Sequence, residues 1–216
     1  MKNNISEILK ILESHYSDEV RTTLNRMREN PDPFKILIGC LVSINIKDDV
    51  TDKILEELFE RVGNFEDIID MDLSELEDML YLARYRKVKA ARLKSVSKEI
   101  IEKFDGEVPD DKDKLLSING IGPKTCNVVL CFAFGKNAIP VDSNTIRIAN
   151  RLGWIDSDKH NEVEELLVDS LEGESLRGAN ALFMLHGKST CVPVSPFCSG
   201  CPVSLECLRV GVEKSR

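Results

Sequence analysis

Apolar residues recur at helical spacing along almost the whole chain, and this pattern restricts the fold more than any other sequence feature. Ile5, Ile8, Leu9 and Leu12, for example, fall on one face of a helix. No segment shows the strict alternation of apolar and polar residues that is typical of a half-buried strand. The pattern predicts about ten short helices and an all-α fold.

The segment from Phe34 to Val42 is nearly all apolar, so we expect a central helix that is buried on most sides. With 216 residues the chain can form one domain or two lobes. It contains no apolar run long enough for a membrane span, and its N-terminus lacks the apolar block of a signal peptide. These features predict a cytoplasmic protein that acts away from membranes.

The charges are unevenly distributed. The net charge of −8 speaks weakly against a nucleic-acid partner. The stretch from Arg84 to Lys98, however, contains seven basic residues and no acid, and it includes Tyr85 near its start. Such a run is usually a solvated helix face, but a basic helix with an aromatic residue also suits nucleic-acid binding.

A glycine-containing turn, Gly120-Ile121-Gly122, joins a predicted helix to a second helix that starts at Pro123. Both glycines permit positive φ and a close approach of another backbone, and proline is favoured at the first helical position. The outward-pointing N–H groups of such a turn suit a phosphate oxygen. A nucleotide-binding P-loop would need glycine before the lysine, so a nucleic-acid clamp or a plain tight turn remains.

Lys124 and Asp142 are the candidate reactive groups. Lys124 follows Pro123 at the start of the second helix, where the positive end of the helix dipole disfavours an ammonium ion. A neutral amine can form a Schiff base, whereas a charged lysine would only contact phosphate. Asp142 is placed to cap the helix that follows, so it has a structural role to weigh against a catalytic one.

Four of the seven cysteines fall within one short segment. Cys191, Cys198, Cys201 and Cys207 have the spacing C-x6-C-x2-C-x5-C, which can wrap one metal centre. Zinc ribbons normally have two separated C-x2-C pairs, and Pro202 after a cysteine is typical of iron–sulfur loops. The spacing favours an iron–sulfur cluster over zinc. The other three cysteines lie in apolar segments and are expected to be core residues: Cys40, Cys126 and Cys131.

Three motifs and the cysteine spacing together resemble endonuclease III, a helix-hairpin-helix DNA glycosylase with a four-iron–four-sulfur cluster. The motifs are LSINGIGPKTCNVVL at 116–130, VDSNTIR at 141–147 and LHGKSTC at 185–191. The resemblance covers nearly the whole chain, from about Phe34 to Cys207. It implies two helical lobes: residues 25–135 form a six-helix barrel with the hairpin, and residues 1–24 with 136–216 form the lobe that carries the cluster loop, 191–207.

The resemblance also implies roles for individual residues. Lys124 matches the family's nucleophile, Asp142 its catalytic acid, and Cys191, Cys198, Cys201 and Cys207 its ligands to a 4Fe-4S cluster. Base release and β-elimination follow when Lys124 attacks C1′ of a flipped nucleotide. The expected partner of this monomer is double-stranded DNA with a damaged base, a mismatch or an abasic site. The expected DNA-contacting residues are Gly120, Ile121, Gly122, Thr125, Asn45, Arg84, Tyr85, Arg86 and Lys87.

Three positions depart from the endonuclease III pattern. Asn45 stands where that family has a glutamine that fills the gap left by the flipped base. Arg84-Tyr85 replaces a glycine followed by a leucine wedge, and a tyrosine can stack on a base. Asn144 replaces a histidine, as in thymine-mismatch glycosylases. These differences preserve the mechanism and leave the substrate base open.

The sequence therefore predicts a bifunctional DNA glycosylase with apurinic/apyrimidinic (AP) lyase activity. The first alternative is a glycosylase for thymine or uracil opposite guanine with weak lyase activity. A non-catalytic damage-binding module would use only the hairpin and the basic stretch. An electron-transfer protein would explain the cysteines but would leave the hairpin without a role.

Overall fold

All regular elements are helical in the part of the chain that the structure, a computed structural model, describes: residues 4–16, 23–27 and 29–216. This confirms the predicted all-α fold. Two compact units share the chain, one formed by Thr22–Lys136 and the other by Met1–Arg21 with Asn137–Arg216. Residues 17–22, part of the predicted N-terminal lobe segment, lie outside the described residues. No described helix is long and apolar enough to cross a membrane.

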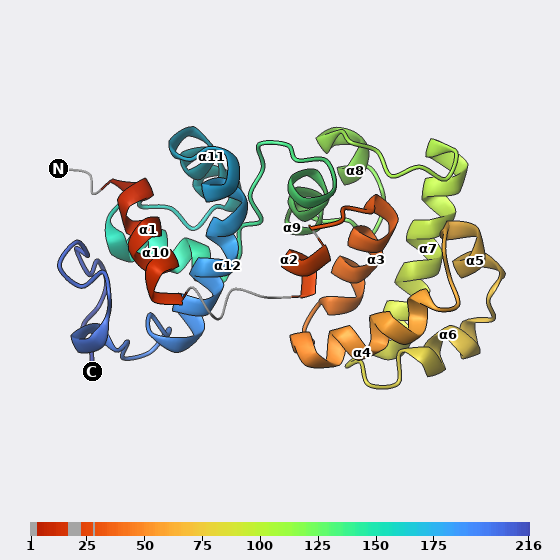
Figure 1. Ribbon diagram of the computed structural model, residues 1–216, viewed down its shortest axis with the longest axis horizontal. Helices are drawn as coiled ribbons and strands as arrows, with labels where there is room; N and C mark the ends of the chain where they lie inside the picture. Colours follow the sequence, from red (N-terminus) through yellow and green to blue (C-terminus); the bar gives the residue numbers. More distant parts are fainter. Residues whose placement is uncertain (1–3, 17–22, 28) are drawn as a thin grey trace. The chain divides into compact units, whose positions relative to one another are not determined.

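The unit Thr22–Lys136 is built around α3 (Pro33–Ser43), which packs against several other helices of this unit, namely α2, α4, α7, α9 and η1. Phe34, Ile36 and every residue from Leu37 to Val42 are buried, as the sequence predicts. Asp32 caps the helix by accepting a hydrogen bond from the Lys35 N–H. The other helices of the unit Thr22–Lys136 are α2 (Thr23–Met27), α4 (Asp48–Phe59), α5 (Phe65–Asp70), α6 (Leu73–Met79), α7 (Arg86–Phe104), α8 (Lys112–Leu116), α9 (Pro123–Val128) and the π-helix η1 (Val129–Ala133) (Figure 1).

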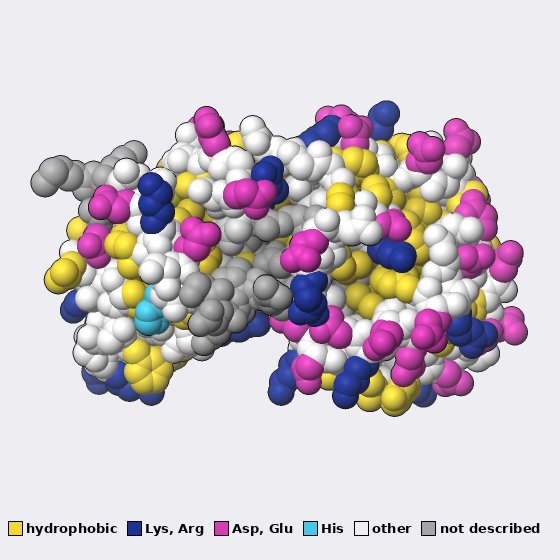
Figure 2. All heavy atoms as spheres, viewed as in Figure 1, with side chains coloured by type: hydrophobic (Ala, Val, Ile, Leu, Met, Phe, Trp, Pro, Cys, Tyr) yellow, Lys and Arg dark blue, Asp and Glu magenta, His cyan; other side chains and the backbone are white. Residues whose placement is uncertain are grey.

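Acidic and basic residues separate along the sequence of this unit. The ten acids between Glu56 and Asp78 fall on α4, α5, α6 and their connections, and Figure 2 shows Asp and Glu side chains spread over this part of the surface. The basic stretch falls on α7 and the turn before it. The negative net charge therefore does not describe the surface around the start of α7.

The second unit packs α1 (Ile5–Tyr16) and α10 (Ser143–Leu152) against α12 (Gly173–Ser189), with α11 (His160–Ser170) beside α1 and α10 (Figure 1). Ile8, Leu12, Trp154 and Phe183 belong to its buried core. After α12 the chain forms the cysteine loop, which contains the short 3-10 helix η2 (Cys198–Gly200). The loop packs on the core through Cys191, Cys201 and Cys207.

Candidate functional site

The predicted hairpin lies between α8 and α9. Gly120 has a φ of +102°, and a Cβ there would meet Arg92 Cγ at 3.2 Å, so this position needs glycine for conformation and for space. Gly122 caps α9 with a φ of −96°, so it does not use the positive φ that glycine permits. No atom lies within 4 Å of the place a Gly122 Cβ would take, so the backbone there is open to a ligand.

Not every hairpin residue can offer its side chain to DNA. Ile121 is only 5% exposed and Thr125 is also buried, so contacts from these residues would be made by the backbone. Gly122 and Lys124 are exposed. The turn is held by a hydrogen bond from the Ile121 N–H to the Ile118 carbonyl. The hairpin thus presents main chain and one lysine rather than a set of side chains.

Lys124 occupies the second position of α9, directly after Pro123. Lys124 lies near enough to Cys40, a buried residue of α3, for its charge to act on the thiol. Burial raises the pKa of the Cys40 thiol, and a hydrogen bond with Thr125 and the nearby charge of Lys124 partly offset this rise. Lys124 therefore lies close to the central helix α3, on a helix, α9, that packs against it.

Asp142 is the N-cap of α10, as predicted. Its Oδ1 accepts hydrogen bonds from the N–H groups of Asn144, at 2.9 Å, and Thr145, at 3.0 Å. The helix runs from Ser143 to Leu152. Lys124 and Asp142 belong to different units of the chain. The cap fixes the direction of the carboxylate before any substrate is bound.

Arg147 connects this helix to the cysteine loop, a role the sequence analysis did not assign. Its Nη2 donates to Asn144 Oδ1, at 2.8 Å, and to the Gly187 carbonyl, at 2.9 Å, while Nε donates to the Cys191 carbonyl. Arg151, one turn further along α10, donates to Cys191 Sγ at 3.3 Å and to the Val192 carbonyl at 2.8 Å. Two arginines at helical spacing thus hold the start of the cysteine loop.

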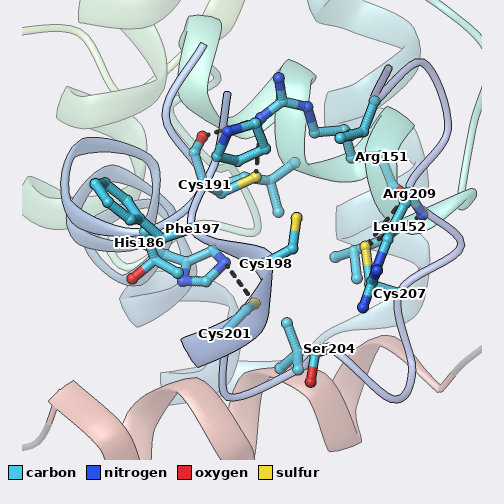
Figure 3. A pocket seen from close by; sticks show the side chains of 15 residues that line it. Arg151, Leu152, His186, Cys191, Phe197, Cys198, Cys201, Ser204, Cys207 and Arg209 are labelled. Carbon is cyan, nitrogen blue, oxygen red and sulfur yellow. Dashed lines mark hydrogen bonds between the residues drawn. The ribbon is translucent and has the colours of Figure 1, made fainter. Parts of the chain in front are cut away.

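The four clustered cysteines line one pocket, and Figure 3 shows their sulfur atoms around it. They are unpaired and half-buried. Their sulfurs have polar neighbours: Cys201 Sγ lies 3.8 Å from His186 Nε2, and the Arg209 N–H donates to Cys207 Sγ. Burial and the neighbouring cysteines raise the pKa of Cys201 to about 11. Thiolates in such a place need a cation, so this donor set fits a metal centre. The remaining cysteines are buried, as predicted: Cys40, Cys126 and Cys131.

The basic stretch is less uniform than the sequence suggested. Arg84, Tyr85 and Lys87 are exposed around the start of α7, and the Arg84 guanidinium lies over the Tyr85 ring. Lys89, in contrast, is buried, and Lys94 donates to carbonyls at the end of α5. Two other expected DNA-contacting residues lie at the surface: Arg86 is half-buried beside Asp78, and Asn45 is exposed in the turn after α3.

Comparison with known proteins agrees with this architecture. Residues 38–172 match the family described as HhH-GPD superfamily base excision DNA repair protein. Endonuclease III of Thermotoga maritima is 32% identical over 88% of this chain and 89% of its own length.

Two solved structures are similar over nearly the whole chain. A trapped endonuclease III–DNA covalent intermediate has a TM-score of 0.82 at 30% identity and covers 97% of this chain and 96% of its own. A thermostable thymine-DNA glycosylase has a TM-score of 0.83 at 26% identity and covers 94% of each chain. The predicted resemblance and enzyme class, DNA glycosylase/AP lyase, are thereby confirmed, and the chain belongs to the HhH-GPD superfamily of base excision DNA repair proteins.

Proposed function

We propose that Lys124 is the nucleophile and Asp142 the catalytic carboxylate of this DNA glycosylase/AP lyase. The observation that carries the proposal is the position of Lys124, exposed at the second residue of α9 and directly after the open backbone of Gly122. A strand whose phosphate is bound by the hairpin amides would bring its sugar close to this amine. Binding of the strand and attack on the sugar would then occur on one rigid element.

The reaction uses the amine twice. Lys124 Nζ attacks C1′ of the flipped nucleotide, the C1′–N bond breaks, and the base leaves with the bonding electron pair. Opening of the sugar ring gives a protonated Schiff base, which withdraws electrons from C2′. Loss of a C2′ proton forms the C2′–C3′ double bond and expels the 3′ phosphate, which cuts the strand. Asp142 would accept the proton of the amine or stabilise positive charge on the sugar.

Substitution of Asp142 by asparagine separates its two roles. Asparagine and aspartate are almost equally good N-caps, so Asp142→Asn keeps the hydrogen bonds to Asn144 and Thr145 while removing the charge. We expect the melting temperature to stay near that of the wild type while base release falls by at least about a hundredfold. Full base release by a folded Asp142→Asn variant would reject the catalytic assignment.

The proposed DNA-contacting surface combines backbone and side chains. Gly120, Gly122 and Thr125 would bind phosphate through main-chain N–H groups, while Ile121, whose N–H donates to the Ile118 carbonyl, would keep the turn in shape. Arg84, Arg86 and Lys87 would add charge beside Tyr85. Asn45 and Tyr85 would enter the duplex, one to fill the gap left by the flipped nucleotide and one to stack as a wedge. Binding that weakens steeply with salt would support the charged contacts.

We further propose that Cys191, Cys198, Cys201 and Cys207 hold a 4Fe-4S cluster. No three His, Cys, Asp or Glu side chains among the described residues are grouped as ligands of one metal ion, whereas the four sulfurs line a common pocket. The single C-x2-C pair and Pro202 directly after Cys201 support an iron–sulfur cluster over zinc. When bound, the cluster would hold the loop in shape, and its chemistry would be that of a structural centre.

The proposal also covers the division into two lobes, the oligomeric state and the DNA substrate. The unit Thr22–Lys136 would be the barrel lobe, close to the predicted range 25–135, and the other unit the lobe with the cluster loop. We propose a monomer that acts on double-stranded DNA containing a damaged base or an abasic site. A second candidate substrate, thymine or uracil opposite guanine, is favoured by Asn144, by Tyr85 and by the similarity to a thymine-DNA glycosylase. A panel of duplexes with single lesions separates the two.

A further inference from the structure

Lys89 is the only buried residue among the seven bases between Arg84 and Lys98, with 7% of its surface exposed. Its Nζ donates hydrogen bonds to the carbonyls of Val42, at 2.9 Å, and Ile44, at 2.6 Å. These carbonyls lie at the C-terminal end of α3, where a helix leaves its last carbonyls without partners. Lys89 therefore caps α3 from a neighbouring helix.

The residue that follows this cap is Asn45, which has a φ of 60°. Tyr85, at the start of α7, has a φ of 62°. Asparagine tolerates the left-handed region, but a bulky tyrosine rarely adopts it. Non-glycine residues persist in this conformation only where the surrounding structure fixes them, and they gather at functional sites. The two residues proposed to enter the duplex thus share the same uncommon backbone conformation.

Lys89 contacts both turns. Its backbone N–H donates to the Tyr85 carbonyl at 3.0 Å, while its side chain reaches the carbonyl of Ile44, directly before Asn45. All of these atoms belong to the unit Thr22–Lys136. A single residue therefore ties the position of one turn to that of the other.

We propose that Lys89 is a positioning residue that holds the Asn45 and Tyr85 turns at the correct separation for insertion into duplex DNA. The inference rests on the proposed function, because it concerns the residues assigned there to the gap and the wedge. Burial and the charge of Arg92 lower the pKa of Lys89 to about 8. Its neutral amine still has two N–H groups, one for each carbonyl, so the cap can persist in either protonation state.

The test compares AP lyase cleavage of duplex DNA with AP lyase cleavage of single-stranded DNA. The probe is an oligonucleotide with a single abasic site, either paired in a duplex or left single-stranded. The Schiff-base chemistry is the same in both, but only the duplex requires a gap to be filled and a stack to be opened. Lys89→Met removes the donors and keeps the apolar stem, Lys89→Arg keeps donors, and Lys98→Met changes an exposed base of the same helix as a control.

We expect Lys89→Met to lower the single-turnover lyase rate on the duplex by about tenfold or more, and to leave the single-stranded rate within about twofold. Lys89→Arg should recover part of the loss, and Lys98→Met should match the wild type. Equal losses on both probes, or no loss on either, would overturn the positioning role. Failure of the wild type to form a borohydride-trapped adduct on either probe would instead overturn the proposed function.

A second measurement detects insertion into the duplex without strand cleavage. A 2-aminopurine placed opposite an uncleavable abasic analogue reports unstacking when residues enter the duplex. At saturating protein, Lys89→Met should give a smaller fluorescence increase than the wild type, and an unchanged increase would overturn the proposal. Lys89→Gln provides the same comparison if thermal melting shows that the methionine variant does not fold.

Discussion

Substitution of Gly187 by alanine should destabilise the protein through a contact that the structure specifies. Gly187 lies in α12, and a Cβ added there would be 2.6 Å from Asn144 Oδ1 and 2.7 Å from Asn144 Cβ. Asn144 has little freedom to retreat, because Arg147 donates to its Oδ1 and its N–H donates to Asp142. The added methyl group must therefore displace the start of α10, where Asp142 lies.

Two opposing contributions set the change in the free energy of unfolding of Gly187→Ala. Overpacking of this kind costs about 1–3 kcal/mol. Alanine in place of a helical glycine recovers up to about 1 kcal/mol. Because both contacts are shorter than 3.0 Å, the overpacking cost falls in the upper half of its range, and the net loss is about 1–2 kcal/mol. For a chain of this length each kcal/mol corresponds to about 2–4 °C, so the melting temperature should fall by about 2–8 °C.

The matched control is Gly178→Ala in the same helix. No atom lies within 4 Å of the place its Cβ would take, so alanine there should raise the melting temperature through helix propensity alone. Both variants are measured by circular dichroism during thermal unfolding of the protein as purified. A Gly187→Ala variant that is as stable as the wild type, or shifts in the same direction as Gly178→Ala, would refute the reasoning.

Three further predictions concern the wedge, the buried lysine and the metal loop. Tyr85→Gly should stabilise the fold by about 1 kcal/mol by removing the left-handed strain while it slows duplex cleavage; a lower melting temperature would contradict this. The pKa of Lys89 falls from 10.5 to about 8 on folding. At pH values between these two pKa values, the unfolded state therefore binds more protons than the folded state. The stability of the wild type relative to Lys89→Met in urea unfolding should therefore rise from pH 8 to pH 10, and a flat difference would exclude this titration. Cys201→Ser should lower bound iron and visible absorbance, whereas Cys131→Ser should retain both; a colourless wild type that contains zinc would contradict the iron assignment.

Local signals in the sequence were sufficient for much of the fold. The apolar run of α3 and the cap at Asp142 were both predicted correctly, because each depends on residues a few positions apart. Apolar spacing along α7 predicts that Val88 is buried together with Leu93 and Val96, and this is wrong, since Val88 is 59% exposed. Its neighbour Lys89 is buried instead, because carbonyls of α3 supply partners that periodicity does not reveal.

Parts of the site could not be predicted from the sequence, because they depend on partners that are distant along the chain. Arg147 joins Asn144 to the Gly187 carbonyl, and its importance depends on a partner forty residues away. The left-handed conformation of Tyr85 could not be predicted, because tyrosine normally avoids it. Glycine permits positive φ at position 122, yet Gly122 adopts an extended conformation as the N-cap of α9. The conformations and contacts of these residues depend on their surroundings in the fold more than on residue type.

The central claim is that the Lys124 amine forms a covalent bond to the sugar of its DNA substrate. The most direct measurement is borohydride trapping on a duplex with one abasic site, comparing the wild type with Lys124→Gln and with Lys98→Met as a control for loss of a surface charge. The account predicts a protein–DNA adduct for the wild type and the control, and none for Lys124→Gln. An adduct of undiminished yield in Lys124→Gln would contradict it.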